Sequence, residues 1–158
     1  MGIPSYFSYI VQNHKKILKR LNKQSVSVNN LYIDSNSLIY DSIYEIVERY
    51  KDDKTFENLL ISNVCSKIEN YINILKPDDT VIIAFDGVAP VAKLEQQRTR
   101  RYKSQFIETT NMKLNPEKQK LPWNKTAITP GTAFMDKLNK DIALYFQIHK
   151  DKFSCKQI

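Results

Sequence analysis

The sequence predicts an α/β fold in which helices flank a parallel β-sheet. Two short apolar, β-prone runs are separated and followed by segments whose apolar residues recur at helical spacing. Strands that alternate with helices are typical of a parallel sheet with right-handed crossovers. The chain has 158 residues, 42% of them hydrophobic and 26% charged, with nine Tyr and seven Phe. This length and composition indicate one folded globular domain.

The two predicted strands differ in their pattern. Residues 31–34 form a short apolar run directly after Asn29 and Asn30. Residues 80–85 contain no polar alternation, which is typical of a strand buried on both faces. We therefore expect the second run to be a central strand of the sheet, ending at Asp86.

Five helices are predicted from apolar spacing. The first begins near Pro4 and carries Tyr6, Ile10, Ile17, Leu18 and Leu21, and the others cover residues 38–50, 55–75, 91–106 and 132–146. Ser35 or Asn36 is expected to cap the second helix, and Pro77 to stop the third. The intervening residues 111–130 contain helix breakers and are expected to form a loop.

The charge balance suggests an anionic partner. The chain has 24 Lys and Arg residues against 17 Asp and Glu residues, which gives a formal net charge of +7. A basic protein of this kind more commonly binds nucleic acid than a membrane surface. Nucleic acid is therefore the expected class of partner.

The cysteines and the hydropathy pattern predict an intracellular protein. Cys65 and Cys155 lack metal-binding spacing, so we expect two free thiols in a reducing compartment. No apolar run reaches the roughly 20 residues of a membrane span, and the N-terminus does not read as a signal peptide. The expected location is cytoplasmic or nuclear, without membrane association.

An aspartate stands at the end of each predicted strand. Asp34 and Asp86 should both project from the carboxyl edge of a parallel sheet, where open α/β folds bind ligands. Two carboxylates in one crevice favour a divalent ion with oxygen ligands, such as Mg²⁺ or Mn²⁺. The alternative is that each Asp is a turn residue or a helix cap. A two-metal site needs further acidic ligands, and none is obvious after Asp86.

The helix predicted after Asp86 is strongly basic. At about 100° per residue, one face collects Lys93, Gln97, Arg100, Arg101 and Ser104. Two guanidinium groups, an ammonium group and an amide suit a terminal phosphate. A Lys- and Arg-rich helix is more often only a solvated surface. Against this alternative, Glu95 is the only acidic residue from Val88 to Ile107.

Five runs of the sequence resemble one family, both in their residues and in their order along the chain. They are GIP at 2–4 with YF at 6–7, LYIDSN at 31–36, FDGVAPVAK at 85–93, QQRTRR at 96–101 and ITPGTAFMDKL at 128–138. Together they are similar to the N-terminal portion of the XRN-type 5′-to-3′ exoribonucleases. The opening GIP run is weak alone, because flap endonucleases begin similarly.

The resemblance implies a PIN-like or flap-nuclease-like α/β core that is incomplete relative to the family, so residues 1–158 would form a partial XRN N-terminal nuclease domain. It implies an Mg²⁺-dependent exoribonuclease that degrades RNA with a 5′ monophosphate and leaves capped RNA alone. Asp34 and Asp86 would be the catalytic, metal-binding acids. The phosphate would be held by Lys93, Gln97, Arg100 and Arg101, the same residues that share the helix face.

Two positions depart from the family. Tyr40 stands where the family has a His that stacks on the first base, and it could stack on that base or belong to the core. Ser37 stands where the family has a Gly. The family's remaining acidic ligands lie further along than this sequence reaches.

Three interpretations stay open after the resemblance is considered. The sequence can be a fragment of a longer nuclease, or a second chain can complete the site. It can also be a module that binds 5′-phosphorylated RNA without cutting it. The third interpretation is a flap-endonuclease-like enzyme that acts on DNA. Two features argue against it, namely the run at 128–138 and the residues Val88, Ala89 and Pro90.

Overall fold

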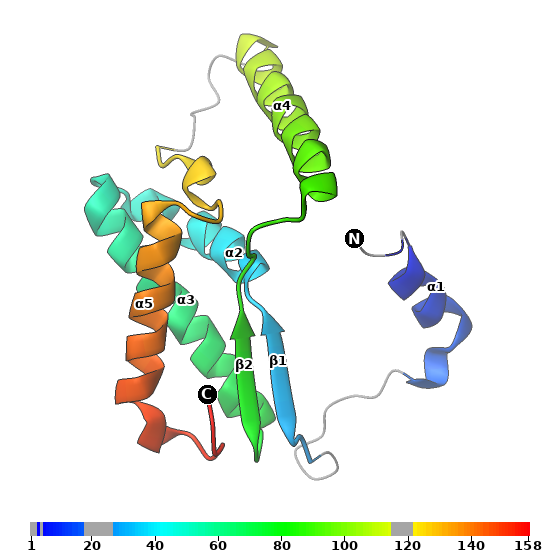
Figure 1. The fold of residues 1–158 in the computed structure, drawn as a ribbon, viewed down its shortest axis with the longest axis vertical. Coiled ribbons are helices and arrows are strands. Elements are labelled where there is room, and N and C mark those ends of the chain that lie inside the picture. The colour runs from blue at the N-terminus through cyan, green and yellow to red at the C-terminus, as the bar shows by residue number, and fades with distance from the viewer. Residues whose placement is uncertain (1–2, 4, 18–26, 115–121) are drawn as a thin grey trace.

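The computed structural model describes residues 3, 5–17, 27–114 and 122–158 of the chain (Figure 1). Its helices are α1 (Tyr6–Asn13), α2 (Asn36–Ile46), α3 (Asp53–Leu75), α4 (Val91–Leu114) and α5 (Ala133–Ile148). The strands are β1 (Asn30–Asp34) and β2 (Thr80–Ala84), and the short 3-10 turns are η1 (Lys15–Ile17), η2 (Val47–Arg49), η3 (Lys125–Ala127) and η4 (Lys150–Lys152). The protein is therefore rich in helix around one small sheet.

The two strands pair in parallel, as the sequence predicts. The register runs from Asn30 opposite Thr80 to Asp34 opposite Ala84. Helix α3 lies between the strands in the sequence and returns the chain to the starting edge of the sheet (Figure 1). Both strands consequently end at the same edge, and this confirms the α/β class with a parallel sheet.

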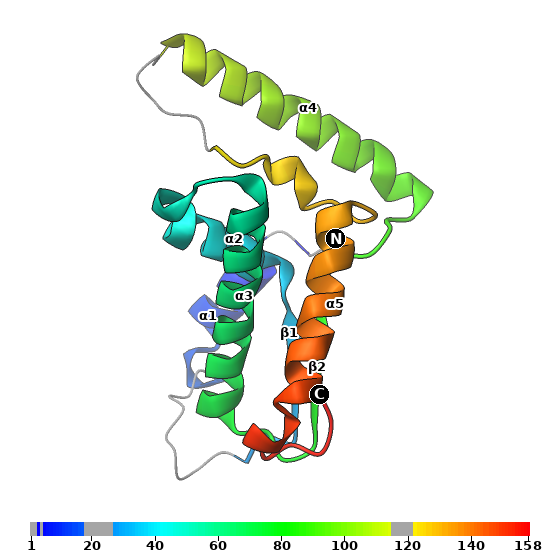
Figure 2. The same cartoon turned by 90° about the vertical axis from the view of Figure 1, so that its left-hand side faces the viewer.

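The expectation that residues 80–85 are buried on both faces is wrong for this structure. Val81 is buried, but Ile82 is 45% exposed, and its partner Tyr32 on β1 is 68% exposed. Helix α3 lies over one face of the sheet, and α5 packs against α3 (Figures 1 and 2). Within the described residues, nothing buries the side chains of the opposite face, although their sequence is apolar.

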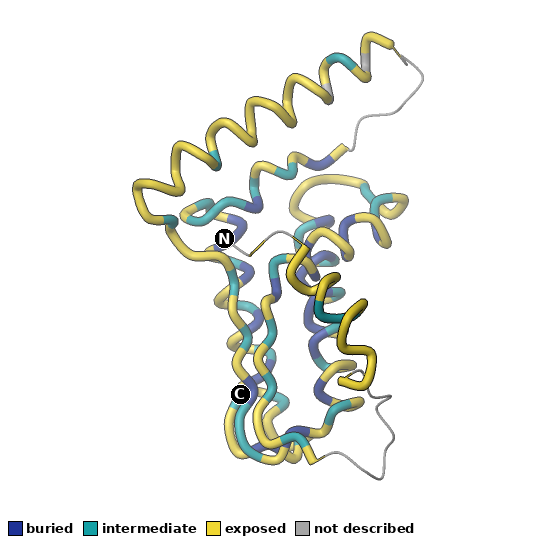
Figure 3. Tube along the Cα trace, turned by 90° about the vertical axis from the view of Figure 1, so that its right-hand side faces the viewer, coloured by how far each residue is buried: buried dark blue, intermediate teal, exposed yellow. Residues whose placement is uncertain are grey.

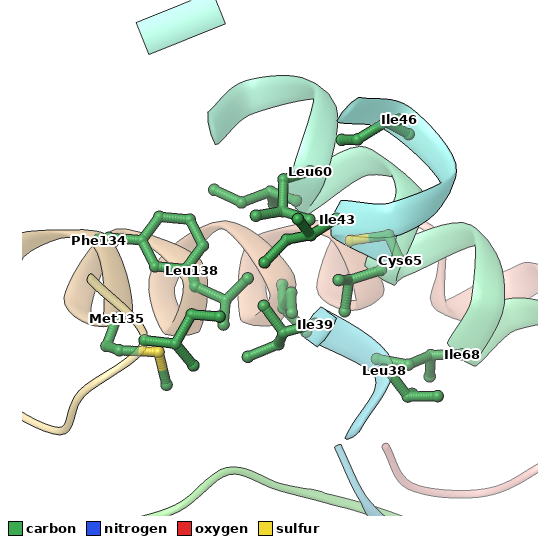
Figure 4. Packing of buried hydrophobic residues seen from close by; sticks show 14 of the residues in the cluster. Leu38, Ile39, Ile43, Ile46, Leu60, Cys65, Ile68, Phe134, Met135 and Leu138 are labelled. Atoms are coloured by element: carbon green, nitrogen blue, oxygen red, sulfur yellow. The ribbon is translucent and has the colours of Figure 1, made fainter. Parts of the chain in front are cut away.

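Helices α2, α3 and α5 form the hydrophobic core with the covered face of the sheet (Figure 4). Helix α2 contributes Leu38, Ile39, Ile43 and Ile46; α3 contributes Phe56, Leu60, Ile61, Val64, Cys65, Ile68 and Ile72; α5 contributes Phe134, Met135, Leu138, Ile142 and Phe146. These residues follow the helical spacing of the sequence, because one face of each helix must meet the others. Both cysteines are free and buried.

A chain of aromatic rings fixes the segment before α5 against the core. The ring of Trp123 lies 5.7 Å from that of Phe56 and 5.0 Å from that of Phe134. Gly131 then turns the chain with a φ of 87°, a left-handed conformation that favours glycine. The hydroxyl of Thr132 accepts a hydrogen bond from the Met135 N–H at 3.3 Å, so Thr132 caps α5.

Two helices differ in extent from the prediction. Helix α1 ends at Asn13, where His14 leaves the helical conformation, and it has no buried residue to support a longer run. Pro4, Leu18 and Leu21, which we expected in this helix, lie outside the described residues. Helix α4 continues to Leu114, past residue 106 and into the segment expected to be a loop. Both α1 and α4 stand away from the core (Figures 1 and 2).

Candidate functional site

The carboxyl edge of the sheet carries both predicted aspartates. Asp34 is the last residue of β1, and Asp86 follows β2 by two residues. The register sets Asp34 opposite Ala84, so the two residues leave neighbouring strands at the same edge. Both are exposed, and their carboxylates are accessible to a ligand from solvent.

Two hydrogen bonds tie the turn after β1 to the end of β2. The Ser35 N–H donates to the Ala84 carbonyl at 2.8 Å, and the Asp86 N–H donates to the Asn36 side-chain carbonyl at 3.0 Å. Ser35 stands at the N-cap position of α2, but its hydroxyl donates to the Ile33 carbonyl at 3.3 Å, so the expected side-chain cap is not formed. Asn36 instead holds the backbone of Asp86, a role that the sequence did not reveal.

The donor set at this edge fits a hard divalent ion only in part. Carboxylate oxygens are the ligands that Mg²⁺ and Mn²⁺ prefer, and Mg²⁺ is commonly held by one or two carboxylates together with water and substrate phosphate. Among the residues that the structure describes, no three His, Cys, Asp or Glu side chains gather into a metal-binding cluster. The edge therefore offers two acidic ligands.

The predicted phosphate-binding residues lie on α4, which begins five residues after Asp86. Lys93, Arg100 and Arg101 are exposed, and Gln97 is half-buried. At a rise of about 1.5 Å per residue, Lys93 and Arg101 are separated by roughly 12 Å along the helix. No ion pair within the described part of the chain neutralises Lys93, Arg100 or Arg101. The face is thus basic, accessible and unpaired there.

One contact joins this face to the core. The Arg101 guanidinium donates to the Thr129 hydroxyl at 3.4 Å, and Thr129 belongs to the segment that Trp123 anchors. The first turn of α4 is the end nearest the sheet, and the helix rises away from it (Figure 1). The structure therefore connects the basic face to the aspartates through residues 86–90. Two grooves on the described surface are lined neither by these aspartates nor by residues of the basic face.

Tyr40 lies on α2, one turn after the residue that holds Asp86. Its side chain is 40% exposed, so it does not belong to the buried core. One further turn along, the ring of Tyr44 is also exposed, and Lys125 donates to its hydroxyl at 2.9 Å with the ammonium 4.7 Å from the ring centroid. The spacing of the two tyrosines is visible in the sequence, but Lys125 is distant in sequence and could not be paired with Tyr44 beforehand.

Comparisons with known proteins give a consistent result. Residues 1–156 match the family described as XRN 5'-3' exonuclease N-terminus. The chain is 33% identical over 164 residues to the 5'-3' exoribonuclease 1 of Saccharomyces cerevisiae, covering 98% of this chain and 10% of that protein. It is 30% identical to the human 5'-3' exoribonuclease 1, covering 96% of this chain and 9% of the relative. The 5'-3' exoribonuclease 2 of Candida glabrata is 28% identical, with 87% and 17% covered.

These relatives are much longer than the chain. It spans between about a tenth and a sixth of their length. None of the helices that the structure describes combines the length and the apolar character needed to cross a membrane.

Proposed function

The chain belongs to the XRN 5'-3' exonuclease N-terminus family, and we therefore propose that it forms the part of a 5′-to-3′ exoribonuclease that holds the 5′ end of the RNA. The observation that carries this proposal is the basic face of α4, defined by Lys93, Gln97, Arg100 and Arg101. This face begins shortly after Asp86 and has no acidic partner within the described residues. An exposed and uncompensated cluster of this kind attracts an anion.

The chemistry of the face suits a terminal monophosphate. A phosphomonoester carries between one and two negative charges at neutral pH and presents three acceptor oxygens. A guanidinium group such as that of Arg100 or Arg101 can donate two parallel hydrogen bonds to such a group. Lys93 adds a compact charge, and Gln97 can donate from its amide. A 5′-hydroxyl end offers none of this charge, so the face should distinguish the two ends.

Tyr40 is proposed to support the first base of the RNA. An exposed aromatic ring can stack on any base, because every base has a π-face. Tyr40 lies on α2, the helix that begins two residues after Asp34 at the carboxyl edge of the sheet. Exposure of the ring supports this role over a place in the core.

Asp34 and Asp86 are proposed to hold Mg²⁺ or Mn²⁺. A bound divalent ion would activate water and stabilise the oxygens of the scissile phosphodiester. The contribution of the chain is to supply two carboxylates at one edge, with Asn36 fixing the backbone of Asp86 at 3.0 Å. Further acidic ligands would come from the portion of the family's chain that lies outside the matched segment, or from a second chain.

A second candidate function is binding of 5′-phosphorylated RNA without cleavage. Among the residues that the structure describes, the edge supplies two carboxylates, whereas a two-metal site normally draws on more acidic ligands, and this observation motivates the second candidate. The basic face of α4 serves both functions, and only turnover separates them.

The test is release of mononucleotides from RNA labelled at a 5′ monophosphate, with Mg²⁺ or Mn²⁺ and with a chelator. The exoribonuclease proposal predicts divalent-dependent release that is lost in Asp86→Ala and kept in Asp151→Ala, which removes an exposed aspartate elsewhere. Binding without release, also when the portion that supplies the further acidic ligands is added, would support the second candidate. Preferential cleavage of a DNA flap would contradict both and indicate a DNA nuclease.

A further inference from the structure

One hydroxyl group on the basic face of α4 has no part in the proposed function. Ser104 lies one turn after Arg100 and Arg101, about 40° from the first and about 60° from the second around the helix axis. Its side chain is exposed. The hydroxyl of Thr99 on the same helix donates to the Glu95 carbonyl at 3.1 Å, whereas the Ser104 hydroxyl has no hydrogen-bond partner within the described residues. It is therefore free to react.

The sequence before Ser104 is strongly basic. Of the six preceding residues, four are Lys or Arg, at positions 98, 100, 101 and 103. Protein kinases choose their substrates partly by charge pattern, and a basic run before the acceptor suits a kinase whose substrate-binding surface is acidic. The six residues before Thr99 contain two basic residues and one acidic residue. The charge pattern therefore favours Ser104 over Thr99 as an acceptor of phosphate.

Helix α4 can open locally to present this residue. A kinase binds its substrate as an extended segment, so the helix around Ser104 must unwind for the transfer. None of the side chains of α4 that the structure describes is buried (Figure 3). Segments with few buried apolar contacts open at a low cost in free energy. The opening therefore does not require the core to unfold.

A phosphate on Ser104 would lie on the basic face. Side chains of a helix tilt toward its N-terminus, so this phosphate would reach back over the turn that carries Arg100 and Arg101. A phosphoserine adds about −1.5 to −2 charges and accepts charge-assisted hydrogen bonds from arginine. Lys93, Arg100 and Arg101 carry the three formal positive charges of the face. More than half of the charge that attracts an RNA end would thus be neutralised.

We propose that Ser104 is a phosphorylation site, and that its phosphate engages the arginines that would otherwise hold the 5′ phosphate of RNA. The inference rests on the proposed function. Phosphoserine and a phosphorylated RNA end are both phosphomonoesters, so they compete for the same donors. The covalent link keeps the phosphoserine at a high local concentration. Phosphorylation would therefore regulate recognition of the RNA end.

The transfer needs a nucleoside triphosphate and a kinase. The Oγ of Ser104 forms a bond to the terminal phosphorus of the triphosphate. The bond between that phosphorus and the bridging oxygen breaks, and the nucleoside diphosphate leaves with the electron pair. The hydroxyl proton passes to a base of the kinase.

The first test treats the full chain with radiolabelled ATP and a purified kinase that requires arginine three residues before its acceptor. We expect label that is absent from Ser104→Ala and kept in Thr99→Ala. A chain that takes up no label, or label that stays in Ser104→Ala and disappears in Thr99→Ala, would overturn the assignment of Ser104.

The second test measures the effect on RNA. Phosphoserine is introduced at position 104 by stop-codon suppression and, as the matched control, at position 99, which lies on the same helix about 140° away. The first should lower affinity for RNA with a 5′ monophosphate about tenfold or more, and for RNA with a 5′ hydroxyl about threefold or less. The control, which adds the same charge, should lower both affinities about threefold or less.

A third measurement needs no RNA. In a ³¹P NMR titration, Arg100→Ala with Arg101→Ala should raise the second pKa of the phosphoserine at position 104, because nearby guanidinium groups favour its dianion. Arg98→Ala with Lys103→Ala should raise it less. Circular dichroism should show the same helix content for both modified chains. Equal increases in the pKa would show that the phosphate does not pair with Arg100 and Arg101, and would overturn the inference.

The binding data separate this inference from the proposed function. A parent chain that binds the two RNAs equally would contradict the proposed function. A parent chain that prefers the monophosphate RNA, and loses this preference equally with phosphoserine at either position, would overturn the role of Ser104 alone.

Discussion

Helices α3 and α4 have nearly the same length but opposite environments. Helix α3 has 23 residues and buries seven side chains, whereas none of the described side chains of α4, a helix of 24 residues, is buried (Figure 3). Apolar residues of α3 form one stripe, but Tyr102 and Phe106 of α4 are exposed. Helical stability normally comes from packing of one face, so α3 is explained by the core. Packing within the described residues does not explain α4, and the feature that sets this helix apart is its charge.

The two helices also differ in their balance of charged residues. Helix α3 contains three acidic and two basic residues, a mixture typical of a solvated outer face. Helix α4 contains six basic and two acidic residues. Such an excess destabilises an isolated helix through repulsion, and it is useful where an anion binds. The comparison supports the proposal that α4 binds an anion, whereas α3 packs against the core.

The largest expected difference is in stability, and a matched pair of substitutions measures it. Phe56 on α3 is fully buried, and Phe106 on α4 is 72% exposed. Phe56→Ala should lower the free energy of unfolding by about 3–5 kcal/mol, because it leaves a cavity beside Tyr50 and Trp123. Phe106→Ala should change it by about 0.5 kcal/mol or less. Equal losses in urea titrations would mean that α4 is packed as α3 is.

A smaller effect on stability, dependent on pH, is expected from the buried thiol of Cys65 on α3. Burial raises the pKa of Cys65 from 9.0 to about 11, with smaller contributions from Asp141 and Glu69. The folded state then binds the proton more tightly than the unfolded state between these values, so stability falls as the pH rises from about 9 to 11. The urea midpoint of the parent chain should therefore drop over this range, and that of Cys65→Ala should drop less. Parallel decreases in both would show that the thiol is not desolvated.

Much of the fold could be predicted because local pattern and packing agree. The apolar stripe of α3 follows from helical periodicity, and the placement of Asp34 and Asp86 at one edge of the sheet follows from the two apolar runs beside them. The exposure of Ile82 could not be predicted, because the sequence of an apolar strand is the same whether the second face of the sheet is covered or open to solvent. Similarly, the pairing of Gln157 with Thr80 joins residues far apart in sequence, and no local signal marks it.

The candidate site likewise has features that the sequence could predict and features that it could not. The shared face of Lys93 and Arg101 follows from helical geometry, which requires only the sequence. The contact of Arg101 with Thr129, and the bond from Asp86 to Asn36, depend on how separate elements are brought together. These contacts decide where the basic face points, and periodicity carries no information about them.

The central claim is that α4 holds a 5′ phosphate, and binding of two RNAs tests it most directly. The double variant Arg100→Ala with Arg101→Ala is compared with Arg98→Ala with Lys103→Ala, which removes the same charge from other faces of α4. Affinities are measured for one RNA ending in a 5′ monophosphate and for the same RNA ending in a 5′ hydroxyl, at one salt concentration.

The account predicts that the first variant loses at least tenfold in affinity for the monophosphate RNA and little for the hydroxyl RNA, while the control variant loses similarly on both. The melting temperature of the first variant should stay close to that of the parent chain, because both arginines are exposed and the hydrogen bond lost, from Arg101 to Thr129, is a long surface contact of 3.4 Å. Equal losses on both RNAs by the first variant would contradict the claim and reduce the face of α4 to a general electrostatic surface.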